Sequence, residues 1–154
     1  MAAVNPSVVV GPPVQPPPSP SGLNETLRPI WDIFSGETQS LPPAIGSAGY
    51  IDVRDVAAIH IWCAENPTES ANQRYLMAEG RGTPQAAADI LRKAYPDRKM
   101  IPVGEPGSDY TPDYSWPKDA MTFVSSKAEK ATGRTFIKYD QSILETAKVF
   151  ERYL

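Results

Sequence analysis

Residues 49–60 constrain the fold more than any other segment, because their side-chain pattern changes period within a dozen residues. Residues 49–51 form a short apolar run, as in a buried strand. Asp52 then offers a carboxylate that can cap the free N–H groups of a helix start. Arg54 and Asp55 form a polar first turn before an apolar run. We therefore expect a strand that turns directly into a helix, with a cap and a local ion pair rather than catalytic carboxylates.

The expected helix after Asp52 is apolar on nearly every side, which predicts a buried helix rather than a surface one. Its histidine, His60, has no acid or nucleophile at a useful spacing, so a hydrogen-bonded structural histidine is expected. Cys63, one turn later, is expected to be a small buried hydrophobic residue. Asn66 followed by Pro67 ends the helix.

The amino-terminal part combines a strand signal with an unusual density of proline. Residues 4–10 include three successive valines and predict a fully buried strand that ends at Gly11. Residues 12–20 contain six prolines, so they form neither a helix nor a central strand. From Leu23 the apolar residues recur at helical spacing, with Ser21 as the expected cap. Pro29 either kinks this helix or marks its true start.

The remaining chain alternates further strand and helix signals. We expect a strand at 74–78, a helix opened by the cap Thr83 and Pro84, a long loop over 101–122, a short helix ending at Gly133, and a final helix from 141 with Asp140 as its cap. Strands that alternate with helices predict an α/β fold. With 154 residues, of which 41% are hydrophobic, the chain can form one domain with a core.

Composition excludes several classes of function. One cysteine and one histidine leave no disulfide framework, no Cys/His zinc site and no histidine-based triad within the chain. The net charge is −3 and the basic residues are scattered, so neither nucleic acid nor an anionic membrane is an expected partner. The amino-terminal residues show no signal-peptide pattern, and we expect a soluble cytoplasmic protein.

Several short segments resemble, in order, a known family of reductases. They are residues 5–12, 23–26, 50–60, 73–76, 101–104, 126–128 with Gly133, and 142–146. The family is the extended short-chain dehydrogenases/reductases, within the NAD-dependent epimerase/dehydratase superfamily. The nearest resemblance is to NADPH-dependent aldehyde and ketone reductases of the dihydroflavonol, cinnamoyl-CoA and methylglyoxal reductase type. The resemblance implies an α/β, Rossmann-type fold, of which this chain is the C-terminal, substrate-side portion.

Under this resemblance the chain is one truncated domain, 1–154. Residues 4–10 are its last Rossmann-type strand, 11–22 a proline-rich loop, and 23–154 the substrate-binding part. The family binds NADPH at a glycine-rich turn and protonates a carbonyl substrate with a Tyr-x-x-x-Lys pair. No glycine-rich fingerprint is present in these residues, so we expect the chain not to bind NADPH alone.

Two segments match Tyr-x-x-x-Lys only formally, at Tyr95 and at Tyr114. In each match a proline lies between the tyrosine and the lysine, so the two side chains cannot share a helical face. We therefore predict no catalytic residue and no metal site in this chain.

By resemblance, Pro6, Ser7 and Val8 face the nicotinamide end of the cofactor, and Ser21 lies near its phosphates or ribose. The expected cover of the small carbonyl substrate is the loop 109–123, with the amphipathic side chains Tyr110, Tyr114 and Trp116. The proline-rich loop has two PxxP matches, but without an adjacent arginine the loop near the substrate and cofactor is the favoured interpretation.

Three functions remain open from the sequence. The favoured one is a truncated reductase-like oxidoreductase that is inactive alone. The second is a binding or assembly partner that completes or modulates another reductase chain, because the 8–10 strand would offer a pairing edge. The third is a non-redox catalyst that uses Asp109, Asp113 and Asp119 of the long loop. Loss of neighbouring strands also predicts aggregation or obligate association, such as a homo-oligomer.

Overall fold

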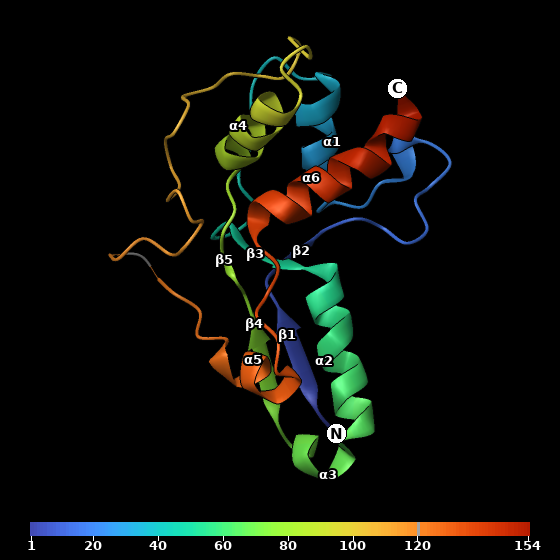
Figure 1. The fold of residues 1–154 in the computed structure, drawn as a ribbon, viewed down its shortest axis with the longest axis vertical. Coiled ribbons are helices and arrows are strands. Elements are labelled where there is room, and N and C mark those ends of the chain that lie inside the picture. Colours follow the sequence, from blue (N-terminus) through green and yellow to red (C-terminus); the bar gives the residue numbers. More distant parts are fainter. Residues whose placement is uncertain (120) are drawn as a thin grey trace.

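The computed structural model describes residues 1–119 and 121–154 (Figure 1). Its strands are β1 (Ala3–Pro6), β2 (Val8–Val10), β3 (Gly49–Asp52), β4 (Arg74–Met77) and β5 (Gly80–Arg81). Its α-helices are α1 (Arg28–Ser35), α2 (Val53–Glu65), α3 (Pro67–Ser70), α4 (Pro84–Ala94), α5 (Ser126–Thr132) and α6 (Tyr139–Phe150). Short 3₁₀ turns occupy Pro20–Gly22 and Glu151–Tyr153. The architecture is α/β, as the alternation of strands and helices predicted.

The strands form two small sheets, and the consecutive strands β1 and β2 each belong to one of them. β1 pairs in parallel with β4, whereas β2 pairs in parallel with β3, which in turn pairs antiparallel with β5. The prediction of one fully buried strand over 4–10 is wrong: the chain bends at Ser7 and only Val10 is buried. Among the described residues, β1 and β2 are edge strands of their sheets, and Val4, Val8 and Val9 are only half-buried.

The step from β3 into α2 has the predicted cap. The Asp52 carboxylate accepts a hydrogen bond from the N–H of Arg54 at 2.9 Å, and the guanidinium of Arg54 pairs with the same carboxylate at 2.8 Å. The predicted burial of α2 is wrong, since Ile59 is fully buried but Ile61 is 59% exposed. Strands β1 to β3 and helix α5 contact α2, and its outer face has no covering element among the described residues.

Prolines and glycines place most helix ends as expected. Pro29 marks the true start of α1, and Thr83 caps α4 through a hydrogen bond from the N–H of Ala86 at 3.2 Å. Two predicted caps are wrong. Ser21 lies in the 3₁₀ turn well before α1, and Asp140 lies inside α6, which begins two residues earlier than the sequence pattern indicated.

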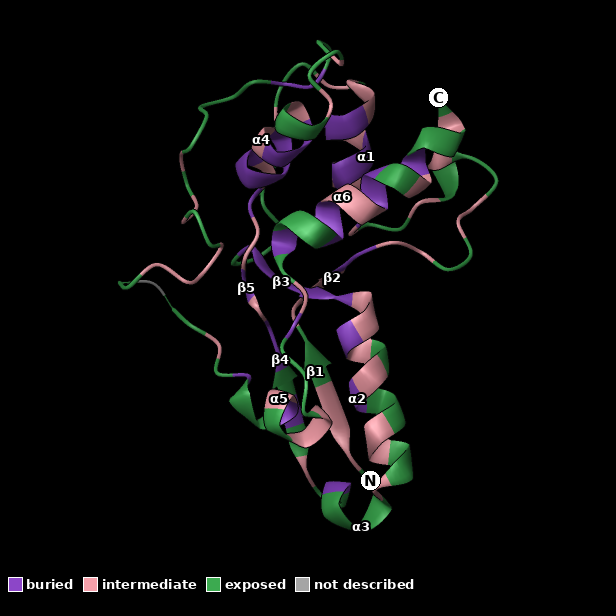
Figure 2. Ribbon diagram, in the orientation of Figure 1, coloured by how far each residue is buried: buried purple, intermediate pink, exposed green. Residues whose placement is uncertain are grey.

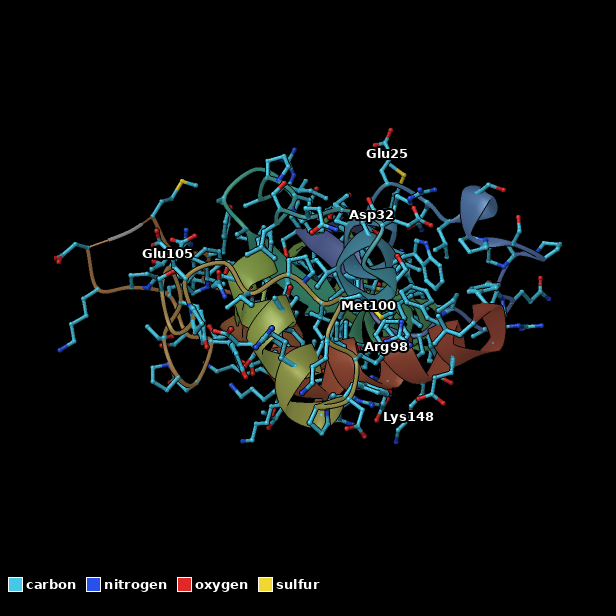
Figure 3. All side chains as sticks on the ribbon, turned by 90° about the horizontal axis from the view of Figure 1, so that it is seen from above. Glu25, Asp32, Arg98, Met100, Glu105 and Lys148 are labelled. Carbon is cyan, nitrogen blue, oxygen red and sulfur yellow. The ribbon has the colours of Figure 1, made fainter. Side chains whose placement is uncertain are left out.

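Three helices pack around the larger hydrophobic core. Figure 2 shows that burial is concentrated in α4 and in the facing sides of α1 and α6. The carboxyl end of α1 is held from outside, because the guanidinium of Arg98 donates to the carbonyl of Phe34 at 3.0 Å. Met100 packs against Gly36 close by, and Figure 3 shows both side chains beside α1. The inner face of α1 packs against α4 and α6.

No helix in the described part of the chain is long and apolar enough to cross a membrane. Within the same residues, no three side chains of the His, Cys, Asp and Glu types form a group suited to a metal ion.

Candidate functional site

A pocket lies between the strands β2 and β3 and the helices α1 and α4. Its cavity volume is about 50 Å³, and it is open to solvent at its mouth. No charged side chain lines it, so it suits an uncharged, largely apolar group. The lining residues are Val8, Val10, Thr26, Pro29, Ile30, Ile33, Pro43, Ile45, Ala48, Gly49, Tyr50, Gly82, Pro84, Ala87 and Tyr139.

Each wall of the pocket follows from the local sequence pattern. The apolar residues of α1 recur at helical spacing, so Ile30 and Ile33 turn to the same side and are both buried. Ala87 lies on the buried face of α4, where its small side chain leaves space for the pocket. Val8 and Val10 alternate along β2 and both point to this side of the small sheet.

Two tyrosines supply side-chain hydroxyls at the pocket wall. The rings of Tyr50 and Tyr139 lie 4.7 Å apart, and the hydroxyl of Tyr139 donates to the carbonyl of Thr83 at 3.3 Å. The hydroxyl of Tyr50 is buried and has no hydrogen-bond partner among the described residues. Burial, with the nearby Glu79 carboxylate, raises the pKa of Tyr50, and burial also raises the pKa of Tyr139. Both phenols therefore keep their protons at neutral pH.

The residues predicted to face the cofactor do not all reach the pocket. Val8 lines it, whereas Ser7 lies at the bend beside it, with its N–H donating to the carbonyl of Met77 at 2.9 Å. The hydroxyl of Ser7 is buried without a partner in the described residues. Pro6 is exposed at the end of β1. Ser21 is exposed on its 3₁₀ turn, hydrogen-bonded to Ser19 at 2.7 Å, and is not a lining residue.

The residues predicted to cover the substrate contact the pocket wall from outside. Tyr110 and Tyr114 stack with ring centroids 6.0 Å apart, and Tyr114 packs against Tyr139 at 5.7 Å. Trp116 packs against Phe123 and lies so close to Gly49 that a Cβ there would be 2.8 Å from the indole. None of the three lines the pocket itself. Residue 120 of the predicted cover, 109–123, lies outside the described residues.

The cover loop is joined to β5 by its backbone. The carbonyl of Tyr114 accepts a hydrogen bond from the N–H of Arg81 at 2.8 Å. A Cβ at Gly80 would stand 2.1 Å from the same carbonyl, so this position has room only for glycine. Arg81 also pairs with Asp109 at 2.7 Å. Sequence analysis found the aromatic residues of this loop but not the glycine that lets the loop approach.

Other side chains of chemical interest lie away from the pocket. The hydroxyl of Tyr95 donates to Glu151, and Lys99 donates to the carbonyl of Pro96, so this formal Tyr-x-x-x-Lys match forms no pair. His60 is hydrogen-bonded as expected, to the carbonyl of Val56 at 2.7 Å, but it is exposed rather than buried. Cys63 is half-buried.

The loop carboxylates invoked for a non-redox catalyst do not converge on the pocket. Asp109 is engaged by Arg81, and Asp113 is exposed and accepts from the hydroxyl of Ser115 at 2.8 Å. Asp119 is also exposed. The structure gives these three residues no common site.

Sequence analysis missed the walls contributed by α1, α4 and α6. The apolar stripes of these helices were visible, but a stripe alone does not show which other stripe it faces. Tyr139 was missed because the predicted helix began after it. The one related feature in the sequence is Gly82. In the structure a Cβ at Gly82 would be 2.2 Å from the ring of Tyr139, so the glycine makes room for this ring.

Comparisons with known proteins show which reductases this chain is similar to. No protein-family model matches the chain. The NADPH-dependent methylglyoxal reductase of Saccharomyces cerevisiae is 34% identical over 149 residues, which are 96% of this chain and 42% of the relative. A cinnamoyl-CoA reductase of Medicago truncatula is 30% identical over 148 residues, again 96% of this chain but 40% of the relative.

Solved structures agree with these relatives. The Gre2 protein of Candida albicans, solved in complex with NADPH, superposes with a TM-score of 0.76 at 30% identity, covering 99% of this chain and 44% of that one. The chain thus spans about two fifths of the length of the relatives it matches. It is homologous, over almost all of its residues, to part of the extended short-chain dehydrogenase/reductase fold.

Proposed function

We propose that this chain forms the carbonyl-substrate side of an NADPH-dependent aldehyde or ketone reductase and does not reduce substrates by itself. The observation that carries the proposal is the uncharged pocket, which has Val8 in its wall next to the Ser7 bend. In the family, the corresponding strand lies beside the nicotinamide. The pocket would therefore hold the apolar part of a carbonyl compound against the reacting end of the cofactor.

The residues present fit one end of NADPH only. The buried Ser7 hydroxyl lacks a partner among the described residues, and a polar group of the nicotinamide end would satisfy it. Pro6 and Val8 would flank that group, and Ser21 would be the contact nearest to the phosphates or ribose. The chain offers no glycine-rich turn for the pyrophosphate. NADPH would supply the hydride, and this chain would bind and orient the carbonyl substrate.

A titration of the purified chain with NADPH, followed by cofactor fluorescence, tests the proposal. We expect no oxidation of NADPH with isovaleraldehyde or methylglyoxal by the chain alone. Addition of the part of the S. cerevisiae relative that the match leaves out should allow oxidation. Turnover by the chain alone would refute the claim that it is incomplete as an enzyme.

A matched pair of variants tests the pocket itself. Ile45→Trp places a large ring at the pocket mouth, where Ile45 is 41% exposed, and should abolish oxidation in the mixture. Val103→Trp adds the same ring at a similarly exposed site outside the pocket and should have no effect. Equal activities of the two variants would show that the pocket is not the substrate site.

A second candidate function, assembly with another chain, rests on the open edge of β1. The N–H groups of Ala3 and Ser7 donate hydrogen bonds to backbone carbonyls on the β4 side. Because successive N–H groups of a strand point to opposite edges, the N–H of Val4 points to the other edge of β1. No strand pairs with that edge among the described residues. In the described part of the chain, β2 is also an edge strand of its sheet, so residues 8–10, where the sequence predicted a pairing edge, offer an open edge beside that of β1. We propose that the β1 edge would pair with a strand of a reductase chain or of a second copy.

The concentration dependence of the molecular mass, measured by sedimentation, tests assembly. Val4→Pro removes the free N–H at the open edge and should yield a monomer at all concentrations. Asn5→Pro is the control, because it removes an N–H on the β4 side and should destabilise the fold instead. A wild-type chain that is a folded monomer throughout would exclude this function.

A further inference from the structure

We propose that Asp89 is a positioning residue, which fixes the wall of the substrate pocket through Tyr110 and the rings stacked behind it. The inference rests on the proposed function, since it concerns the same pocket. Asp89 itself lies on α4 and does not line the pocket. It acts through contacts that can be followed one by one from α4 to Tyr139.

The first step joins α4 to the long loop. One oxygen of Asp89 accepts hydrogen bonds from the N–H of Gly107 at 2.8 Å and from the hydroxyl of Tyr110 at 2.9 Å. The other oxygen accepts from the side-chain amide of Gln85 at 2.9 Å, one turn earlier on the helix. Gln85 accepts in turn from the N–H of Glu105 at 2.8 Å. Two side chains of one helix face thus hold residues 105–110.

The orientation of the Tyr110 hydroxyl is well defined. Burial, together with the hydrogen bond to Asp89, raises the pKa of Tyr110 to about 12. The hydroxyl therefore keeps its proton and donates a hydrogen bond to the carboxylate, a charge-assisted bond with a strong preference for one geometry. The ring of Tyr110 can rotate about its axis but cannot leave the carboxylate without losing this bond.

The second step transmits this position to the pocket. The Tyr110 ring stacks on Tyr114 with an interplanar angle of 18°, and Tyr114 packs on Tyr139. The backbone of Tyr114 is held at β5, because its carbonyl accepts a hydrogen bond from the N–H of Arg81. Tyr139 cannot retreat toward Gly82, where its ring is already in close contact. A shift of Tyr110 therefore changes the space beside Tyr139, which lines the pocket.

A double-mutant cycle on ligand binding tests the inference. The probe is prodan, an uncharged apolar naphthyl ketone whose emission shifts in an apolar site. Tyr110→Phe removes only the hydroxyl, and Asp89→Ala removes its acceptor. We expect each to weaken prodan binding roughly three- to tenfold, and the double variant to be no weaker than the weaker single variant. Fully additive losses would overturn the inference.

Tyr95→Phe is the matched control. Its hydroxyl also donates to a carboxylate, that of Glu151 at 2.8 Å, but Tyr95 lies at the carboxyl end of α4 and does not line the pocket. This variant should bind prodan as the wild type does. Unchanged prodan binding by Asp89→Ala and Tyr110→Phe, with only a lower unfolding midpoint, would show that Asp89 is merely structural.

A measurement without ligand keeps the inference separate from the proposed function. In tyrosine-labelled protein, the ring resonances of Tyr139 report the position of the Tyr114 ring beside it. They should shift alike in Asp89→Ala and Tyr110→Phe and stay unchanged in Tyr95→Phe. If the wild type binds no prodan but these shifts occur, the proposed function fails and the positioning role stands. If the resonances do not move, the positioning role is refuted.

Discussion

Replacement of Asp52 by asparagine should cost far more stability than the loss of an ordinary surface ion pair. Asp52 is fully buried and receives four hydrogen bonds. Three come from the backbone and guanidinium of Arg54, and one from the hydroxyl of Ser142 on α6 at 2.5 Å. Asparagine keeps the shape and the helix cap, but it turns an amide N–H₂ toward donors. The carboxylate joins β3, α2 and α6, so its loss affects three elements.

The magnitude follows from the exposure of the partners. Loss of one member of a buried ion pair costs roughly 3–5 kcal/mol. The Arg54 side chain is 35% exposed and keeps a second partner, Glu145, so solvent and that pair offset part of the loss. We expect Asp52→Asn to lower the free energy of unfolding by about 2–3 kcal/mol at pH 7.

The pH dependence gives an independent check. Burial alone would raise the pKa of Asp52, but the hydrogen bonds from Arg54 and Ser142 outweigh it and hold the pKa below 3.8. A lowered pKa in the folded state means that the stabilisation is complete above 3.8 and is lost as the pH falls through the folded value. The difference between Asp52→Asn and the wild type should therefore shrink at pH 3.

Urea unfolding followed by tryptophan fluorescence at pH 7 and pH 3 measures both effects. The control is Asp32→Asn, which removes the partner of Arg28 in an i,i+4 pair at 2.7 Å on the surface. That pair should contribute about 0.5 kcal/mol. Equal losses in Asp52→Asn and Asp32→Asn at pH 7 would refute the central role given to Asp52.

Four further substitutions test the other structural assignments. Ile59→Ala should cost about 3 kcal/mol in urea unfolding because Ile59 is fully buried, whereas Ile61→Ala on the same helix should stay within about 0.5 kcal/mol; similar losses would contradict the exposed outer face of α2. Thr83→Ala should cost about 1 kcal/mol through loss of the cap of α4, and an unchanged unfolding midpoint would contradict that role. Asp55→Asn should flatten the pH dependence of stability above pH 3.8. Burial raises the pKa of Asp55, so the wild type loses stability as the pH rises from 3.8 through the pKa in the folded state. An identical pH profile in the variant would refute this.

Features that depend on neighbours in sequence were predictable. The caps at Asp52 and Thr83 each join a side chain to an N–H two or three residues later. The helix stop at Gly133 needs only a backbone with positive φ, which glycine adopts at low cost. In each case the interacting atoms lie within one turn of chain, so a local pattern suffices.

Features that depend on partners distant in the sequence were not predictable from local patterns. The apolar residues of α2 are the same whether its outer face is covered or open, so the pattern predicted burial where the structure shows Ile61 exposed. The strand expected over 4–10 bends at Ser7 because β4 pairs with its first half and β3 with its second. No property of the valines themselves indicates that change of partner.

The start of α6 shows how such a distant constraint shapes the pocket. The sequence favoured a helix from 141, but two acidic residues distant in the sequence hold Ile137 and Lys138, which precede Tyr139. Asp55 accepts from the N–H of Ile137 at 2.8 Å, and Glu79 pairs with Lys138. With both residues held, the helix begins at Tyr139, and its ring is placed against Gly82 in the pocket wall. An error of two residues in a helix boundary is ordinary for sequence patterns, yet here it separates a tyrosine outside the helix from one that lines the pocket.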